Sequence, residues 1–196
     1  MRFRLAVCVF ILMGMCAPMR AQDRKSQNSL TVSFPNKTWW VEANSPGFAV
    51  KGKGRKPDGR YYLFAHDART GVILSVMLEQ APEGADSSTC PAYLQGRMQS
   101  VAKLGVVPTD AKTSEFNSMA VLEYMIPTVD GKAVQQKNVM ACTMKEDVYV
   151  DVHLSKAQFQ ASDEEMLVDI LNHVEVTSAS APVRTSTAVS TEVPAH

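Results

Sequence analysis

The chain has little cysteine and little histidine, with four residues of each among 196, and its lack of certain motifs excludes several kinds of site. It contains no Cys-x-x-Cys and no closely spaced pair of histidines, so a zinc site is not expected. It contains no Gly-x-Ser-x-Gly, the sharp turn that exposes the nucleophile in many hydrolases. There is no internal repeat. The sequence therefore predicts no metal and no other cofactor, and it does not name a reaction.

Charge of one sign is also missing, because 20 basic and 20 acidic side chains balance and are well mixed along the chain. A surface for nucleic acid or for an anionic membrane needs clustered positive charge, so neither is expected as a general partner. Beyond the first 21 residues no apolar stretch can span a bilayer, since a spanning helix needs about 20 apolar residues. The mature chain is expected to have no transmembrane segment.

Residues 1–21 have the three-part pattern of a secretory signal peptide. Arg2 and Arg4 form a short basic region, and Leu5–Met15 is an apolar run. Ala21 is a small residue after which a signal peptidase can cut. The pattern predicts cleavage near Ala21 and a periplasmic or secreted mature protein.

Two alternatives to cleavage stay open. Cys16 could be the lipid-bearing residue of a lipoprotein, but Met15 before it is bulky for that signal. The apolar run could instead stay in the membrane as an anchor. Its eleven residues would rise only about 16 Å as a helix, well short of a hydrocarbon core of about 30 Å.

Removal of the signal peptide changes the charge and the cysteine count. Three arginines and no acidic residue leave with it, so the mature chain has 17 basic and 20 acidic side chains, a net charge of −3. Only Cys90 and Cys142 remain. In an oxidising compartment this pair predicts a disulfide that closes a loop of about fifty residues. The alternative is two buried free thiols, since cysteine packs as a small hydrophobe.

The mature chain is long enough for one domain with tails. Residues 22–29 are polar and are expected to be loose. Residues 30–176 are expected to form a single domain. Residues 177–196 are rich in Ser, Thr, Ala and Pro and have few large apolar side chains, so they are expected to be disordered.

Within that domain, segments in which apolar residues alternate or run together predict strands. They are Leu30–Phe34, Trp39–Val41, Phe48–Lys53, Arg60–His66, Gly71–Gln80, Ser114–Ile126, Lys132–Lys145 and Val148–Ser155. The nearly continuous apolar run in Gly71–Gln80 predicts a central strand that is buried on both faces. Lys56-Pro-Asp-Gly59 predicts a hairpin turn before Arg60.

Two amphipathic helices are expected between and after these strands. The first is capped by Ser88 and ends at Gly105. The second covers Asp163–His173, with Ser162 and Glu165 as a capping box. The order of strands, helix, three strands and helix predicts an α+β fold, in which an antiparallel sheet packs with two helices.

Several segments resemble the Mog1/PsbP-like fold, which occurs in many exported bacterial proteins of unknown role. They are Phe34-Pro with Trp40-Val-Glu, Ser45-Pro-Gly-Phe48, Gly71-Val-Ile-Leu-Ser-Val76, and Tyr149-Val-Asp-Val-His-Leu-Ser155 before a helix that begins at Asp163. The resemblance covers most of the predicted domain and implies a layered sandwich. The family includes photosystem accessory subunits and nuclear transport factors, so it implies no single activity and no functional residue is carried over.

The most pronounced charge feature is a basic cluster with glycines between its members. It consists of Lys51, Lys53, Arg55, Lys56 and Arg60. Its Gly-x-Gly opens no helix and lacks a following Gly-Lys-Ser/Thr, so it is not a nucleotide loop. It predicts either a solvated hairpin tip or a surface for an anionic ligand or an envelope protein.

The adjacent residues Trp39 and Trp40 point to opposite faces of a strand, so one is expected in the core and the other at the surface. An exposed tryptophan near the basic hairpin would suit a binding face. The candidate binding residues are therefore Lys53, Arg55, Lys56, Arg60, Trp39 and Trp40. They favour a non-enzymatic binding or accessory module of the cell envelope.

The alternative is a hydrolase or a metal-dependent enzyme that uses His153 with Asp151 or His66. Asp151, His153 and Ser155 alternate along one predicted strand and therefore share a face. Residues two apart on a strand are about 6.6 Å apart, whereas known catalytic triads converge from separate elements. A strand with one solvent-exposed face explains the same pattern, and no catalytic residue is assigned.

Overall fold

The computed structural model describes residues 30–178. The predicted signal peptide, the predicted loose segment 22–29 and the tail beyond Ser178 lie outside the described residues.

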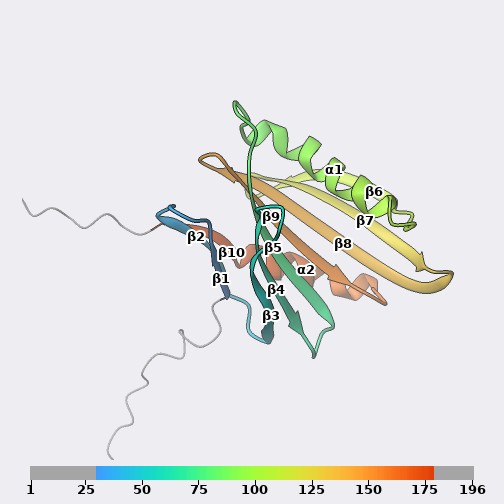
Figure 1. Cartoon of the computed structure of the whole chain (residues 1–196). Helices are drawn as coiled ribbons and strands as arrows, with labels where there is room; N and C mark the ends of the chain where they lie inside the picture. The colour runs from blue at the N-terminus through green and yellow to red at the C-terminus, as the bar shows by residue number, and fades with distance from the viewer. Residues whose placement is uncertain (1–29, 179–196) are drawn as a thin grey trace, which may run out of the picture.

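The described chain forms two antiparallel sheets and two α-helices (Figure 1). The strands are β1 (Leu30–Ser33), β2 (Trp39–Ala43), β3 (Phe48–Arg55), β4 (Tyr61–Asp67), β5 (Val72–Gln80), β6 (Thr109–Phe116), β7 (Met119–Val129), β8 (Lys132–Lys145), β9 (Val148–Lys156) and β10 (Val174–Ser178). The helices are α1 (Cys90–Ala102) and α2 (Glu164–Asn172). The small sheet has the order β1-β2-β10, and the large sheet has the order β3-β4-β5-β9-β8-β7-β6. The predicted α+β class is confirmed.

The two faces of the large sheet have different partners, as Figure 1 shows. Helix α1 packs on β7 and β8, and we call this side the α1 face. The small sheet and α2 cover the opposite side, the α2 face, where the larger apolar core lies. Trp39 of β2 is only 1% exposed in that core, so the sequence prediction that one tryptophan of the pair is buried is confirmed.

Strand β5 is less enclosed than its apolar sequence predicts. Val72, Leu74, Val76 and Leu78 are fully buried on the α2 face. On the other face, Met77 is also buried but Ile73 is only half-buried, because α1 packs mainly on β7 and β8. The middle strand of the sheet is β9, which pairs with β5 on one side and β8 on the other.

Two strand assignments differ from the sequence prediction. The predicted strand Ser114–Ile126 is a hairpin, because Asn117 and Ser118 both have positive φ and reverse the chain between β6 and β7. No strand was predicted at Val174–Ser178, yet β10 pairs with β2 there. The fold therefore continues beyond the predicted boundary at Val176, because pairing with β2 orders two polar residues that have little apolar surface of their own.

The helix starts also differ in detail from those predicted. Asp86, not Ser88, provides the first cap, since its side chain accepts a hydrogen bond from the backbone N–H of Ser88 and starts a short 3-10 turn. Before α2, the capping box pairs Gln160 with Asp163. Both helices lie where the apolar periodicity predicts them, and each begins after a 3-10 turn that the periodicity does not reveal.

Gly47 occupies a turn that should not tolerate a side chain. Its φ is +104°, and a Cβ there would lie 3.1 Å from Oδ2 of the buried Asp67. Asp67 accepts hydrogen bonds from the Arg69 N–H and the Thr70 hydroxyl, which hold its carboxylate in place. We expect Gly47→Ala to destabilise the protein by more than the roughly 1–2 kcal/mol of a positive φ alone.

Urea unfolding measures this cost. The matched control is Gly84→Ala, because Gly84 also has a positive φ, +78°, but nothing lies within 4 Å of its Cβ position. Equal losses of stability in the two variants would mean that the contact with Asp67 has no effect.

Candidate functional site

A disulfide joins the start of α1 to β8. Cys90 and Cys142 are bonded, with a distance of 5.5 Å between their Cα atoms, and both are 1% exposed. The predicted pairing is confirmed. The bond fixes the first residue of α1 to β8. The polar contacts of Tyr93 and Arg97 with the sheet come from the same helix.

A buried carboxylate lies beneath α1, on β9. Asp151 is 1% exposed, and its Oδ2 lies 3.2 Å from Nε of Arg97, an ion pair without hydrogen-bond alignment. The Tyr93 hydroxyl lies 3.5 Å from the same oxygen and donates a hydrogen bond to Glu79 at 3.1 Å. Among the described residues, Asp151 Oδ1 has no hydrogen-bond partner. Burial raises the pKa of Asp151 to about 6, against the opposing effect of Arg97.

His153, two residues along the same face of β9, has a different partner. Its Nε2 lies 3.1 Å from the Asn138 side-chain oxygen on β8. Burial lowers the pKa of His153 to about 4, so the imidazole is neutral at pH 7. Asp151 and Ser155 do share this face with it, but both are buried, and the predicted solvent-exposed face is wrong.

The residues of the enzymatic alternative do not converge. No hydrogen bond among the described residues links His153 to Asp151 or to Ser155. His66 lies on β4, and β5 separates that strand from β9. Among residues 30–178, no group of three His, Cys, Asp or Glu side chains could hold a metal ion. Asp151 is therefore part of the packing beneath α1, and His153 is part of the contact between β9 and β8.

The basic hairpin consists of β3, the Lys56–Gly59 turn and β4. It carries its positively charged side chains at the outer edge of the large sheet. Strand β3 is an edge strand, and Lys51, Lys53 and Arg55 are exposed on it. The Arg55 guanidinium lies 5.9 Å from the centre of the Tyr61 ring, and Lys56 Nζ lies 5.8 Å from that of Tyr62. Lysines also protect an exposed edge from pairing with another sheet.

Arg60 differs from the other members of the cluster because it is neutralised. Its guanidinium forms an ion pair with Asp58 and lies 3.9 Å from Glu79. Hydrogen bonding to Arg60 lowers the pKa of Asp58 to about 2, which keeps this pair charged over a wide pH range. Arg60 therefore orders the hairpin, and the available positive charge comes from Lys51, Lys53 and Arg55 with Lys56.

The structure places a different aromatic group beside the hairpin from the one predicted. Trp39 is buried and cannot contact a partner, which corrects its selection as a binding residue. Trp40 is half-buried on the small sheet, where its Nε1 donates to Glu42. Phe34 instead packs edge-on against Tyr61, with ring centres 5.3 Å apart.

The rings of Phe34 and Tyr61 and the hairpin turn line a groove of about 440 Å³ that is open to solvent. Its lining includes Phe34, Pro35, Arg55, Asp58, Gly59, Arg60, Tyr61, Glu79 and Gln80. The only local sequence feature at this groove is Phe34-Pro35, an aromatic residue followed by a proline just after the first strand ends.

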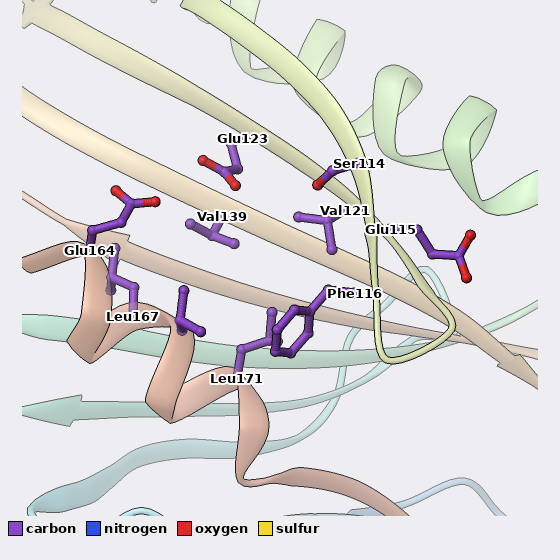
Figure 2. Close-up of a pocket in the computed structure, with 10 residues that line it drawn as sticks. Ser114, Glu115, Phe116, Val121, Glu123, Val139, Glu164, Leu167 and Leu171 are labelled. Carbon is purple, nitrogen blue, oxygen red and sulfur yellow. The ribbon is translucent and has the colours of Figure 1, made fainter.

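A second, smaller cavity lies between α2 and the β6–β7 hairpin, as Figure 2 shows. Its volume is about 80 Å³. Val121, Val139, Leu167 and Leu171 give it an apolar lining, and Phe116 closes one end. Sequence reasoning missed this cavity because it treated β6 and β7 as one strand.

The fold belongs to a known structural class. An antiparallel sheet with helices on both faces and a second small sheet is similar to the solution structure of cyanobacterial PsbP (CyanoP) from Synechocystis sp. PCC 6803. The TM-score is 0.50 and the sequence identity 15%, over 84% of this chain and 99% of that chain. No protein-family model and no curated protein sequence matches the chain. The predicted PsbP-like fold is confirmed, and an identity this low shows the fold alone.

Among residues 30–178, no helix combines the length and the hydropathy that crossing a membrane requires.

Proposed function

We propose that this protein is an exported accessory module that binds an acidic surface of an envelope protein through its basic hairpin. The observation that carries the proposal is the group of exposed cations on the hairpin, Lys51, Lys53 and Arg55, none of which forms a salt bridge within the described residues. Lys56, which is half-buried, lies beside them on the turn. They lie on one edge and one turn, so a single partner surface can meet all of them.

The aromatic rings beneath the cations support this function. Tyr61 and Tyr62 keep Arg55 and Lys56 close to the sheet, which lowers the entropy lost when a partner binds them. The groove beside Arg55 offers an aromatic floor next to positive charge, a combination common in protein interfaces.

The proposal includes export, which the disulfide supports. A structural disulfide persists in oxidising compartments and is rare in the cytosol. We expect protein recovered from the envelope fraction to begin at or near Gln22, as N-terminal sequencing would show. Recovery of full-length protein with Met1 in the cytosol would contradict export.

The enzymatic alternative has no observation in its favour. Asp151 is enclosed beneath α1 and is engaged by Arg97, and His153 is engaged by Asn138. Asp151, which is 1% exposed, is closed to substrate by this packing, and His153 has no nucleophile or carboxylate hydrogen-bonded to it within the described residues.

Charge reversal tests the proposed surface. The triple variant Lys53→Glu, Arg55→Glu and Lys56→Glu should lose most capture of partner protein from envelope extract, and 0.5 M salt should weaken capture by the wild type, because exposed charges are screened.

The matched control reverses three other exposed lysines, Lys103, Lys112 and Lys132, and so makes the same change in net charge. Equal capture by the two triple variants, with equal thermal midpoints, would exclude the hairpin as the binding surface.

A further inference from the structure

The groove beside the basic hairpin lies on one face of the large sheet. Arg55 pairs with Tyr61 across β3 and β4, and Tyr61 pairs with Leu78, which is fully buried on the α2 face. Residues directly opposite each other in a sheet share a face, so Arg55 and Tyr61 both lie on the α2 face. Lys53 is two residues before Arg55 on β3 and shares that face. Two cations of the hairpin are therefore on the side of the groove.

Lys56 lies on the other face of the hairpin. Its Nζ is 5.8 Å from the centre of the Tyr62 ring, and Tyr62 alternates with Tyr61 and so points to the α1 face. On that face the Tyr62 ring lies over Gly52, where a Cβ would be 3.4 Å from the ring. Arg55 and Lys56 thus have similar contacts with a tyrosine on opposite faces, and of the two only Arg55 lines the groove.

The acidic side chains that line the groove already have partners. Asp58 forms an ion pair with Arg60. Glu79 lies 3.9 Å from the same guanidinium and accepts a hydrogen bond from the Tyr93 hydroxyl. Arg55 lines the groove as well but forms no salt bridge within the described residues. The uncompensated charge at the groove is therefore positive, which favours an acidic ligand.

The apolar part of the groove consists of Phe34, Pro35 and Tyr61. The Phe34 and Tyr61 ring centres are 5.3 Å apart and the ring planes are inclined at 63°. Both rings are half-buried and Pro35 is exposed, so this apolar floor is open to solvent. The volume of about 440 Å³ falls within the roughly 300–1,000 Å³ of ligand sites.

The backbone at the groove is used within the protein. In the turn, the Lys56 N–H donates to the Arg60 carbonyl and the Gly59 N–H donates to the Lys56 carbonyl. Strands β4 and β5, which contribute Tyr61 and Glu79, are each paired on both sides. A segment bound here must be recognised through its side chains and not by strand addition. A polyproline II segment suits such a site, because it makes no internal hydrogen bonds and docks on aromatic-lined grooves.

We infer that the groove binds an acidic, proline-containing segment of the envelope protein in the polyproline II conformation. The prolines pack on Phe34 and Tyr61, and the carboxylates meet Arg55 and Lys53. This inference rests on the proposed function, since it uses the same hairpin, and it adds which face of the hairpin binds and what the partner presents to it.

Peptide titration with amide chemical-shift mapping tests the site in the full mature chain. The probe is acetyl-Glu-Pro-Glu-Glu-Pro-Glu-amide, whose prolines are three residues apart and so lie on one side of a polyproline II helix. We expect saturable shifts at Phe34 and at residues 58–61. Replacing both prolines of the probe by serine should weaken binding about tenfold, because apolar contact and the preformed conformation are lost. Replacing its glutamates by glutamine should abolish saturation.

Two matched pairs of variants place the peptide on the protein. Arg55→Gln should weaken binding several-fold, whereas Lys56→Gln, on the opposite face, should leave it unchanged. Phe34→Leu should also weaken binding several-fold. Its control is Phe64→Leu, because Phe64 is 37% exposed but lies on the α1 face of β4.

Equal binding by the Arg55→Gln and Lys56→Gln variants, both with native thermal midpoints, would overturn the inference. So would equal binding of the proline and serine peptides. The proposed function fails separately, if the triple charge-reversal variant captures partner protein as the wild type does. Loss of capture by that variant, together with equal binding by the two glutamine variants, would overturn this inference alone.

Discussion

Loss of the Cys90–Cys142 disulfide should lower the free energy of unfolding by about 4 kcal/mol, because the bond closes a loop with a sequence separation of 52. The chain-entropy model assigns this stabilisation to the restricted unfolded chain. Both cysteines are 1% exposed, so removing the bond also leaves two small side chains to pack within the α1 core.

Urea unfolding of the oxidised wild type and of the Cys90→Ala, Cys142→Ala variant measures the loss. Because the bond is buried, the wild type must be reduced in denaturant and then refolded before it is compared. The alanine variant should not respond to reductant, which makes it the control for side effects of the reagent. Equal unfolding midpoints for the oxidised wild type and the variant would contradict the prediction.

Removal of the disulfide should also reduce the local stability of α1 more than that of the sheet. The disulfide connects the first residue of α1 to β8, whereas the other end of α1 leads to Leu104, which is 81% exposed. Without the bond, the helix is held by the ion pair of Arg97, the packing of Leu94 and the contacts of Tyr93 with Glu79 and Tyr149. Amide exchange in α1 should therefore accelerate more than exchange in β5 or β9.

Stability of the Asp151→Asn variant should fall steeply on acidification, whereas that of the His153→Gln variant should rise. The pKa of Asp151 is raised from 3.8 to about 6, so its stabilising contribution is complete below pH 3.8 and is lost as the pH rises through 6. The pKa of His153 is lowered from 6.5 to about 4, so its contribution is complete above pH 6.5 and is lost as the pH falls through 4.

The two contributions oppose each other between about pH 4 and pH 6.5. Each corresponds to a shift of more than two pH units, or roughly 3 kcal/mol, so they nearly cancel in the wild type. Asp151→Asn removes one contribution and leaves the acid sensitivity of His153. His153→Gln removes the other contribution and leaves that of Asp151, whose protonated carboxyl group is favoured by the folded state.

Urea unfolding at pH 4, 5, 6 and 7 gives the three profiles. The asparagine keeps the volume of Asp151, and the glutamine can still donate to Asn138, so the comparison concerns charge and not packing. The Arg97 side chain, 27% exposed, can reach solvent when its partner is neutral. Parallel profiles for wild type and both variants would mean that neither group titrates with a shifted pKa.

Residue spacing predicted much of the local structure. The turn at Asp58-Gly59, the apolar run of β5, the two helices and the burial of one tryptophan of the Trp39–Trp40 pair all follow from periodicity and turn chemistry, which act over a few neighbouring residues. The division of β6 from β7 was missed because the reversing residues, Asn117 and Ser118, include no glycine, although asparagine tolerates a positive φ.

The candidate sites could be predicted only in part. The basic hairpin is local, so its charges and the Arg60–Asp58 ion pair lie close together in the sequence, but the approach of Glu79 to Arg60 depends on a contact between β5 and the hairpin. The cavity beside β6 depends on α2, which follows β6 by more than forty residues, and no local pattern indicates that pairing.

The sequence by itself determined which segments form strands and helices and which side chains share a face, because a strand alternates every two residues and a helix repeats every 3.6. Only the tertiary structure decided what covers each face. Asp151 and His153 share a face by spacing, but their shifted pKa values depend on tertiary surroundings, in which Tyr93 and Arg97 of α1 lie over Asp151 and Asn138 of β8 lies beside His153. The physical reason is that backbone geometry is set by near neighbours, whereas burial and charge environment are set by residues distant in the chain.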